Sequence, residues 1–259
     1  MALNSELKKD IKKQLIDKIR TKVASYDFSK KSGNPFIDII FGKYSNIKSF
    51  IHGMATTLGS DYELIARKIA NSNPDFVECK KFAFIGKISD SESAIIKSLA
   101  KDLEEKERKS DYNEEIKLVY GANDKNVKDT KITIDLYLKD KKGKEYFIEM
   151  KGPDPNKKEV RAAKEDLLNV VAMKKRGVLL KDFHNKVVII FGVYYNNHEG
   201  KYENWKVSPM FESRKGLFVQ EEFWDFLGGE GTFKELLKVI TEVREEVKLL
   251  INNAIESHV

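Results

Sequence analysis

The stretch FIEMKG at residues 147–152 combines apolar and charged side chains in an order typical of a β-strand. Phe147, Ile148 and Met150 are apolar, which predicts a strand buried on at least one face. Glu149 and Lys151 lie two residues apart, so in a strand their side chains point to the same face. Charged side chains are rare on buried strands unless they are paired, and this pair therefore marks a candidate site.

A second strand precedes this stretch and carries a further carboxylate. Residues 131–138 read KITIDLYL, and a polar turn at 139–144 that contains Gly143 joins them to the strand at 144–152. An antiparallel hairpin of these two strands brings Asp135 close to Glu149. Residues 115–122 and 186–196 are predicted as two more strands.

Helices are predicted before, between and after the strands. Helices are predicted in five ranges, of which the second is interrupted around Gly59: 4–24, 45–71, 91–107, 158–176 and 232–256. Residues 221–229 are predicted as an aromatic helix or turn. The order of helices, then β-β-β-α-β, then helices indicates an α/β or α+β fold with a central mixed sheet flanked by helices. We expect one domain over residues 1–259, with helical extensions at both ends.

The composition limits the class of protein. The 259 residues are 41% hydrophobic and 34% charged, with a net charge of +6 that permits an anionic partner. The single cysteine, Cys79, excludes an internal disulfide and a Cys-rich zinc site. No apolar run approaches the roughly 18 residues of a membrane span, and the charged N-terminus lacks the apolar core of a signal peptide. We expect a soluble cytoplasmic protein without a membrane partner.

The hairpin indicates metal chemistry. Two neighbouring carboxylates, here Asp135 and Glu149, repel each other unless a cation joins them. Carboxylate oxygens suit Mg²⁺, which also binds substrate phosphates and activates water. Lys151 could orient the attacking water and stabilise developing negative charge.

The residue pattern resembles the PD-(D/E)XK nuclease signature. Seven other glutamates have lysine two places on, so the context distinguishes Glu149: an apolar strand that follows Asp135 and precedes Gly152-Pro153. Ile134 stands where the signature has proline. Residues 56–70 look like the N-terminal helix of restriction enzymes with this fold, with Glu63 as the carboxylate.

Residues 149–174 are similar to the TdeIII/MjaII-like type II restriction endonucleases, and the resemblance covers about 45–200. It implies a restriction-endonuclease-like core and Mg²⁺-dependent cleavage of both strands of a short palindromic site, with GGNCC as the associated sequence. By the resemblance, Asp135, Glu149 and Glu63 bind the metal and Lys151 acts in catalysis. Double-stranded DNA is the expected partner, and a homodimer would match a palindrome.

Candidate DNA contacts lie at the start of the helix that follows the strand at 144–152. They are Asn156, Lys157, Lys158, Arg161 and Lys164, of which Lys157, Arg161 and Lys164 can share one helical face. Arginine and lysine read guanine edges or hold phosphates, although an ordinary solvated face explains the same residues. Residues 30–36 form another candidate phosphate loop.

Other interpretations stay open. The same fold could belong to a repair or recombination nuclease, or the chain could bind DNA without cutting it. The last helix has a long apolar stripe from Leu236 to Ile255, which either packs on its own domain or forms a dimer.

Overall fold

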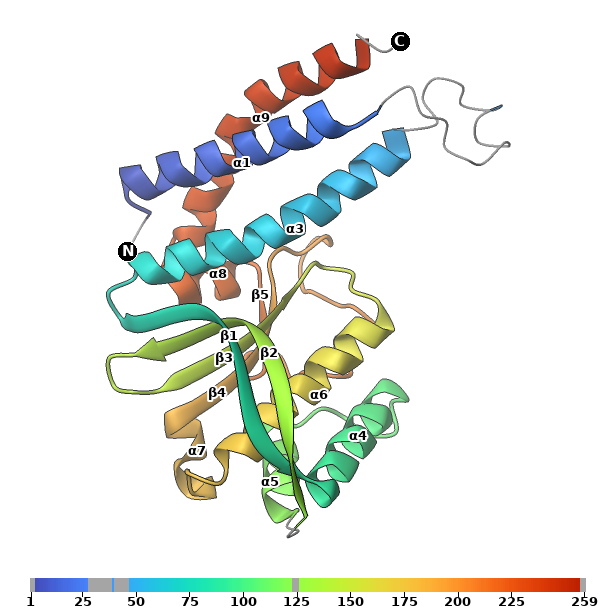
Figure 1. Ribbon diagram of the computed structural model, residues 1–259, viewed down its shortest axis with the longest axis vertical. Helices are drawn as coiled ribbons and strands as arrows, with labels where there is room; N and C mark the ends of the chain where they lie inside the picture. Colours follow the sequence, from blue (N-terminus) through green and yellow to red (C-terminus); the bar gives the residue numbers. More distant parts are fainter. Residues whose placement is uncertain (1–2, 28–38, 40–46, 123–125, 257–259) are drawn as a thin grey trace. The chain divides into compact units, whose positions relative to one another are not determined.

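The computed structural model describes residues 3–27, 39, 47–122 and 126–256, and the predicted loop at 30–36 lies outside them (Figure 1). The chain divides into two compact units. The first comprises residues 1–65 and 230–259, and the second comprises residues 66–229. The helices predicted as extensions form the first unit and the candidate site lies in the second, and the expectation of a single domain stays a prediction.

Helices form the first unit. They are α1 (Ser5–Ser25), the larger part of α3 (Ile47–Ser72), and α9 (Thr232–Glu256). Asn4 caps α1 by accepting a hydrogen bond from the Leu7 amide at 2.8 Å. The helix predicted at 4–24 is confirmed, whereas the predicted interruption at Gly59 is wrong, because α3 runs through it.

Helix α9 packs along α1 within this unit. Lys8 pairs with Glu235, and Lys12 lies 3.8 Å from Glu246. The first part of the apolar stripe of α9 is buried, at Leu236, Val239 and Val243. This burial favours the interpretation that the apolar stripe packs within its own unit and does not form a dimer.

A five-stranded mixed sheet organises the second unit, as predicted (Figure 1). The strands lie in chain order: β1 (Phe76–Ser89), β2 (Val127–Asp140), β3 (Glu145–Lys151), β4 (Val187–Val193) and β5 (Leu217–Val219). The first three pair antiparallel and the last two add in parallel. Gly143, with φ of 81°, turns the chain between β2 and β3 as the hairpin requires.

Helices cover both faces of this sheet. Three of them pack on one face of the sheet and enclose a continuous apolar core with it: α4 (Asp90–Glu104), α5 (Tyr112–Gly121) and α6 (Lys157–Lys174). Two shorter helices complete the unit, α7 (Leu180–Lys186) and α8 (Glu221–Gly228). On the other face, Phe223 of α8 packs so closely on Gly192 that a Cβ there would meet its ring at 2.6 Å.

The strand predicted at 115–122 is wrong, because these residues belong to α5. Asp111 caps this helix by accepting hydrogen bonds from the amides of Asn113 and Glu114. Its buried residues Tyr112, Glu115, Ile116 and Val119 have helical spacing. Strands β1 and β5 and helix α7 were not predicted.

In the described part of the chain, no helix is long and apolar enough to cross a membrane.

Candidate functional site

A β-bulge in β2 shapes the candidate site. Lys80 pairs with Tyr137, but Phe82 pairs with Ile134, so Asp135 and Leu136 together oppose the single residue Lys81. Ile134 and Tyr137 consequently contribute to the same core although they are three residues apart. The bulge thus breaks the alternation of side chains at Asp135.

The bulge lets Asp135 turn toward β3. Pairing of β2 with β3 ends at Leu136 and Ile148, so Asp135 and Glu149 are the next residues on the two strands. Beyond that point Asp135 Oδ2 accepts a hydrogen bond from the Met150 amide at 3.0 Å, which replaces a ladder bond. The hairpin therefore brings the two carboxylates together, as the sequence predicts.

Two cationic side chains from other elements contact Asp135. The Arg67 guanidinium at the end of α3 donates to the Asp135 carbonyl oxygen at 3.2 Å. The Lys81 ammonium lies 3.8 Å from Asp135 Oδ1 and its side chain is 52% exposed. Sequence reasoning missed both residues, since nothing in the sequence shows that the bulge places them against Asp135.

Glu149 is a buried carboxylate with an unsatisfied oxygen. Its side chain is 8% exposed, and its Oε1 is buried without a hydrogen-bond partner in the structure. Burial, and then the charge of Asp135, raise the pKa of Glu149 to about 8, while Lys151 opposes this rise. A buried oxygen that lacks a partner is costly unless something else binds it.

Lys151 bridges the two carboxylates. Its ammonium lies 3.4 Å from Asp135 Oδ2 and 3.6 Å from Glu149 Oε2, and the side chain is 28% exposed. It therefore faces the acids on one side and solvent on the other. The three predicted residues Asp135, Glu149 and Lys151 form one cluster in the structure.

The donor set of this cluster fits a hard divalent cation. Asp135 and Glu149 supply carboxylate oxygens, and the unpartnered Glu149 Oε1 is an acceptor that a cation would satisfy. Among the described residues, no group of three or more His, Cys, Asp or Glu side chains is arranged to hold a metal ion. Two protein carboxylates suffice for Mg²⁺, because this ion keeps several waters and binds substrate phosphate.

Asp166 of α6 adds a further acidic group that sequence reasoning missed. Burial, and then Glu165, raise the pKa of Asp166, and the charges of Lys151 and Asp135 also act on it. Asp166 in turn raises the pKa of Glu149. Its place in a helix with many charges gave no signal in the sequence.

Glu63 lies on α3 within the first unit, whereas the cluster belongs to the second unit. Its predicted role as a metal ligand stays a prediction.

The predicted DNA contacts fall into two groups. Lys157 and Lys158 are exposed at the start of α6, and Lys157 lies 4.9 Å from the ring centre of Trp205. Asn156 caps α6 through a reciprocal pair of hydrogen bonds with Glu159 at 2.9 Å, so its side chain has a structural role.

The other two predicted contacts are engaged with acids. Arg161 binds Glu165 at 2.9 Å and lies 3.3 Å from Glu104. Lys164 is 3% exposed and pairs with Glu115 inside the core. Lys164 is therefore buried in a structural ion pair. It does not form an exposed basic face together with Lys157 and Arg161.

Comparison with known proteins identifies the kind of chain that carries this cluster. Residues 3–244 match the family described as "Type II restriction endonuclease, HinfI". The chain is similar to the type II restriction enzyme MjaII of Methanocaldococcus jannaschii, with 29% identity over 78% of this chain and 56% of the relative. It thus matches little more than half the length of that relative.

Two enzymes of Herpetosiphon aurantiacus are similar over more of their length. The type II restriction enzyme HgiEI is 23% identical over 76% of this chain and 72% of its own. The type II restriction enzyme HgiBI is 24% identical over 85% of this chain and 82% of its own. No solved structure matches the chain.

Proposed function

Because the chain belongs to the HinfI family of type II restriction endonucleases, we propose that it cleaves both strands of duplex DNA at a short palindromic site. The observation that carries the proposal is the cluster at the β2–β3 end: two carboxylates bridged by Lys151, with a buried Glu149 oxygen that has no partner. The fold alone would not assign this activity, since one fold serves many functions.

Asp135 and Glu149 are the residues that would hold Mg²⁺. When bound, the ion supplies positive charge for the phosphate in the transition state and lowers the pKa of water. The Met150 amide fixes the Asp135 carboxylate, so this oxygen is in place before substrate arrives. Glu63 as a further ligand belongs to the same proposal.

Lys151 has two tasks in this proposal. In the absence of metal its ammonium lies close to both acidic groups, at 3.4 Å from Asp135 and 3.6 Å from Glu149. In catalysis its exposed side orients the attacking water and donates a hydrogen bond to the phosphate oxygen as negative charge develops.

Lys81, on strand β1 of the protein, would contact the same phosphate. Its ammonium lies 3.8 Å from Asp135 Oδ1, and half of the side chain faces solvent. A cation at this place attracts an anionic group to the metal-binding carboxylates.

The recognition sequence and the assembly are the finer parts of the proposal. We infer a site related to GGNCC and a homodimer whose two-fold axis coincides with that of the palindrome. Mapping of the cut ends tests the first part, and the mass of the protein in solution with and without a cognate duplex tests the second.

Digestion of unmethylated duplex DNA tests the activity. We expect discrete bands with Mg²⁺, none with EDTA, and none with the Lys151→Ala variant. The matched control is Lys97→Ala, which removes an exposed lysine of α4 and should cut normally. Cutting that occurs only at branched or damaged DNA would favour a repair or recombination nuclease, and duplex binding without any cutting would favour a non-catalytic DNA-binding protein.

A further inference from the structure

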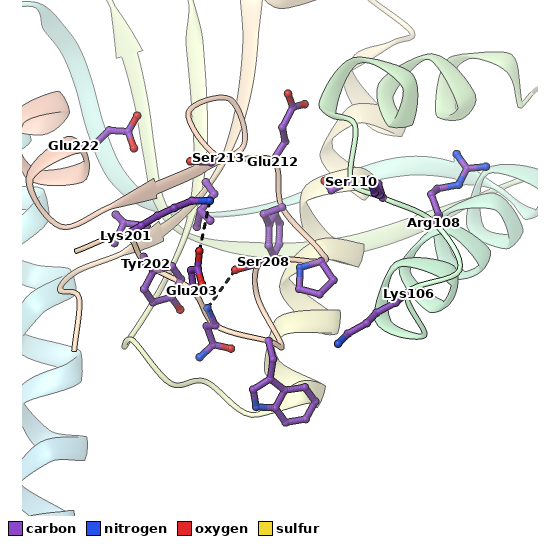
Figure 2. Close-up of a pocket in the computed structure, with 17 residues that line it drawn as sticks. Lys106, Arg108, Ser110, Lys201, Tyr202, Glu203, Ser208, Glu212, Ser213 and Glu222 are labelled. Carbon is purple, nitrogen blue, oxygen red and sulfur yellow. Dashed lines mark hydrogen bonds and ion pairs between the residues drawn. The ribbon is translucent and has the colours of Figure 1, made fainter. Parts of the chain in front are cut away.

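A cavity of about 870 Å³ opens in the second unit, away from the carboxylate cluster. Figure 2 shows Lys106, Arg108 and Ser110 on one side of it, and Lys201, Tyr202 and Glu203 on the other. The first group belongs to the turn between α4 and α5, and the second to the segment that follows β4. Apolar side chains also line the cavity: Trp205, Pro209, Phe211, Leu217 and Val219.

Three acidic side chains line this cavity, Glu203, Glu212 and Glu222, and the first two lie close to lysines. Glu203 lies 3.7 Å from Lys201. Glu212 lies 2.7 Å from Lys215 and accepts a hydrogen bond from the Tyr112 amide at 2.9 Å. These acids therefore do not oppose an anion as strongly as isolated carboxylates would.

The cations on the α4–α5 turn, in contrast, have no acidic partner. Within the part of the chain that the structure describes, the side chains of Lys106, Arg108 and Lys109 form no ion pair or hydrogen bond. Glu107 lies between these cations in the sequence but does not line the cavity, so three cationic side chains face the cavity from this turn. Such a surface fits a ligand that is both anionic and partly apolar.

Lys106 adopts a backbone conformation that a lysine rarely takes. Its φ is 62°, and its amide donates to the Leu103 carbonyl while the Glu107 amide donates to the Asp102 carbonyl. This pattern ends α4 in a Schellman motif, where the left-handed position usually belongs to glycine. The Schellman hydrogen bonds hold Lys106 in this conformation, and its side chain lines the cavity.

The far wall of the cavity is tied to the loop that follows the catalytic strand. The Tyr202 hydroxyl donates to the Pro153 carbonyl at 2.8 Å, and the Asn204 side-chain amide donates to it at 3.0 Å. Pro153 comes two residues after Lys151. Trp205, which is 61% exposed, lies next to these residues and beside Lys157.

We propose that this cavity binds the sugar–phosphate backbone of the DNA that flanks the cleaved bond. Residues 106–109 hold the phosphates, and Trp205 covers a sugar or base edge. This inference rests on the proposed function and deepens it, because it assigns a binding surface outside the carboxylate cluster. The hydrogen bonds at Pro153 then connect DNA contact at the cavity to the loop beside Lys151.

The salt dependence of duplex binding tests the proposal. With the full chain in EDTA, binding to a fluorescent duplex is measured across a series of KCl concentrations. Each lost phosphate contact lowers the slope of log K against log salt by about 0.9, so Arg108→Ala/Lys109→Ala should lower it by about 1.8. The matched control, Lys97→Ala/Lys101→Ala, removes two exposed lysines of α4 outside the cavity and should leave the slope unchanged.

Lys106 and Trp205 provide a second, independent test. Lys106→Ala and Lys106→Gly both remove the ammonium and should weaken binding equally, whereas only the glycine relieves the left-handed backbone and raises Tm by roughly 2–4 °C over the alanine variant. Trp205→Ala should weaken binding without changing the salt slope. Thermal melts establish that each variant is folded.

The outcomes separate this inference from the function on which it rests. If the wild-type chain neither binds nor cuts any duplex, the proposed function fails and this inference fails with it. If the wild type cuts DNA but the cavity variants bind as the control variant does, this inference alone is overturned. Equal loss of slope in the cavity pair and the control pair also overturns it, because the effect would then be one of total charge.

Discussion

Replacing Glu149 by glutamine should stabilise the metal-free protein at neutral and mildly alkaline pH. The wild-type carboxyl is 8% exposed, its Oε1 has no hydrogen-bond partner, and burial with the neighbouring Asp135 raises its pKa to about 8. Glutamine has nearly the same shape but never carries the charge. The prediction is therefore a gain in stability together with a loss of the metal site.

The size and the sign follow from the two pKa values. The folded carboxyl keeps its proton up to about pH 8, whereas the unfolded chain releases it near the ordinary value of 4.5. Stability that is fully present below pH 4.5 is thus lost as the pH rises toward 8, at about 1.4 kcal/mol per pH unit at most. This sets a ceiling of about 3 kcal/mol at pH 7, and the pKa from which it follows already includes the opposing charge of Lys151.

Denaturant unfolding of both proteins in EDTA from pH 5 to pH 9 measures this difference. The two free energies of unfolding should agree at low pH and separate progressively up to about pH 8, and Mg²⁺ should narrow the gap by stabilising the wild type alone. Glu105→Gln, at an exposed position, is the control and should show no such separation. A gap that does not change with pH, or a wild type that gains on the variant as pH rises, would refute the reasoning.

Further changes test other parts of the cluster and the core. Lys151→Ala should lower the cleavage rate by about 10² to 10³ without weakening duplex binding, and equal losses in both assays would contradict its role. Lys81→Ala should lower kcat/KM by about tenfold, because a cation beside Asp135 is lost, and unchanged kinetics would remove Lys81 from the site. Lys164→Met should cost about 3–5 kcal/mol in urea unfolding, because Glu115 is left buried and unpaired. The double variant Lys164→Met/Glu115→Leu should recover most of this loss.

The carboxylate hairpin was predictable because its parts are close in sequence. The strands, the turn at Gly143 and the positions of Asp135, Glu149 and Lys151 all follow from a short stretch with clear alternation. Strand β1 also had a signal, since Phe82, Phe84 and Ile88 recur at even spacing, but the charged residues Glu78, Lys80 and Lys81 in its first half obscured it. Residues 115–122 were misjudged because their mixed apolar run suits a strand until the Asp111 cap is considered.

The neighbours of the cluster were not predictable, because they depend on pairing between distant segments. Lys81 reaches Asp135 through the register of β1 with β2, and Arg67 reaches it from α3. Lys164 looked like a solvated base on a helix, and only the partner Glu115 on another helix explains its burial. Ion pairs across long sequence separations leave no local pattern to read.

The bulge in β2 makes the length of this strand as important as its composition. Ile134 and Tyr137, three residues apart, both reach the same core because one extra residue shifts the phase of the strand between them. A chain that lacked Leu136 would keep Ile134 and Tyr137 on the core face by ordinary alternation, and would turn Asp135 to the opposite face. Removal of this one buried residue would therefore displace the Asp135 carboxylate from the site, although it deletes no charged group.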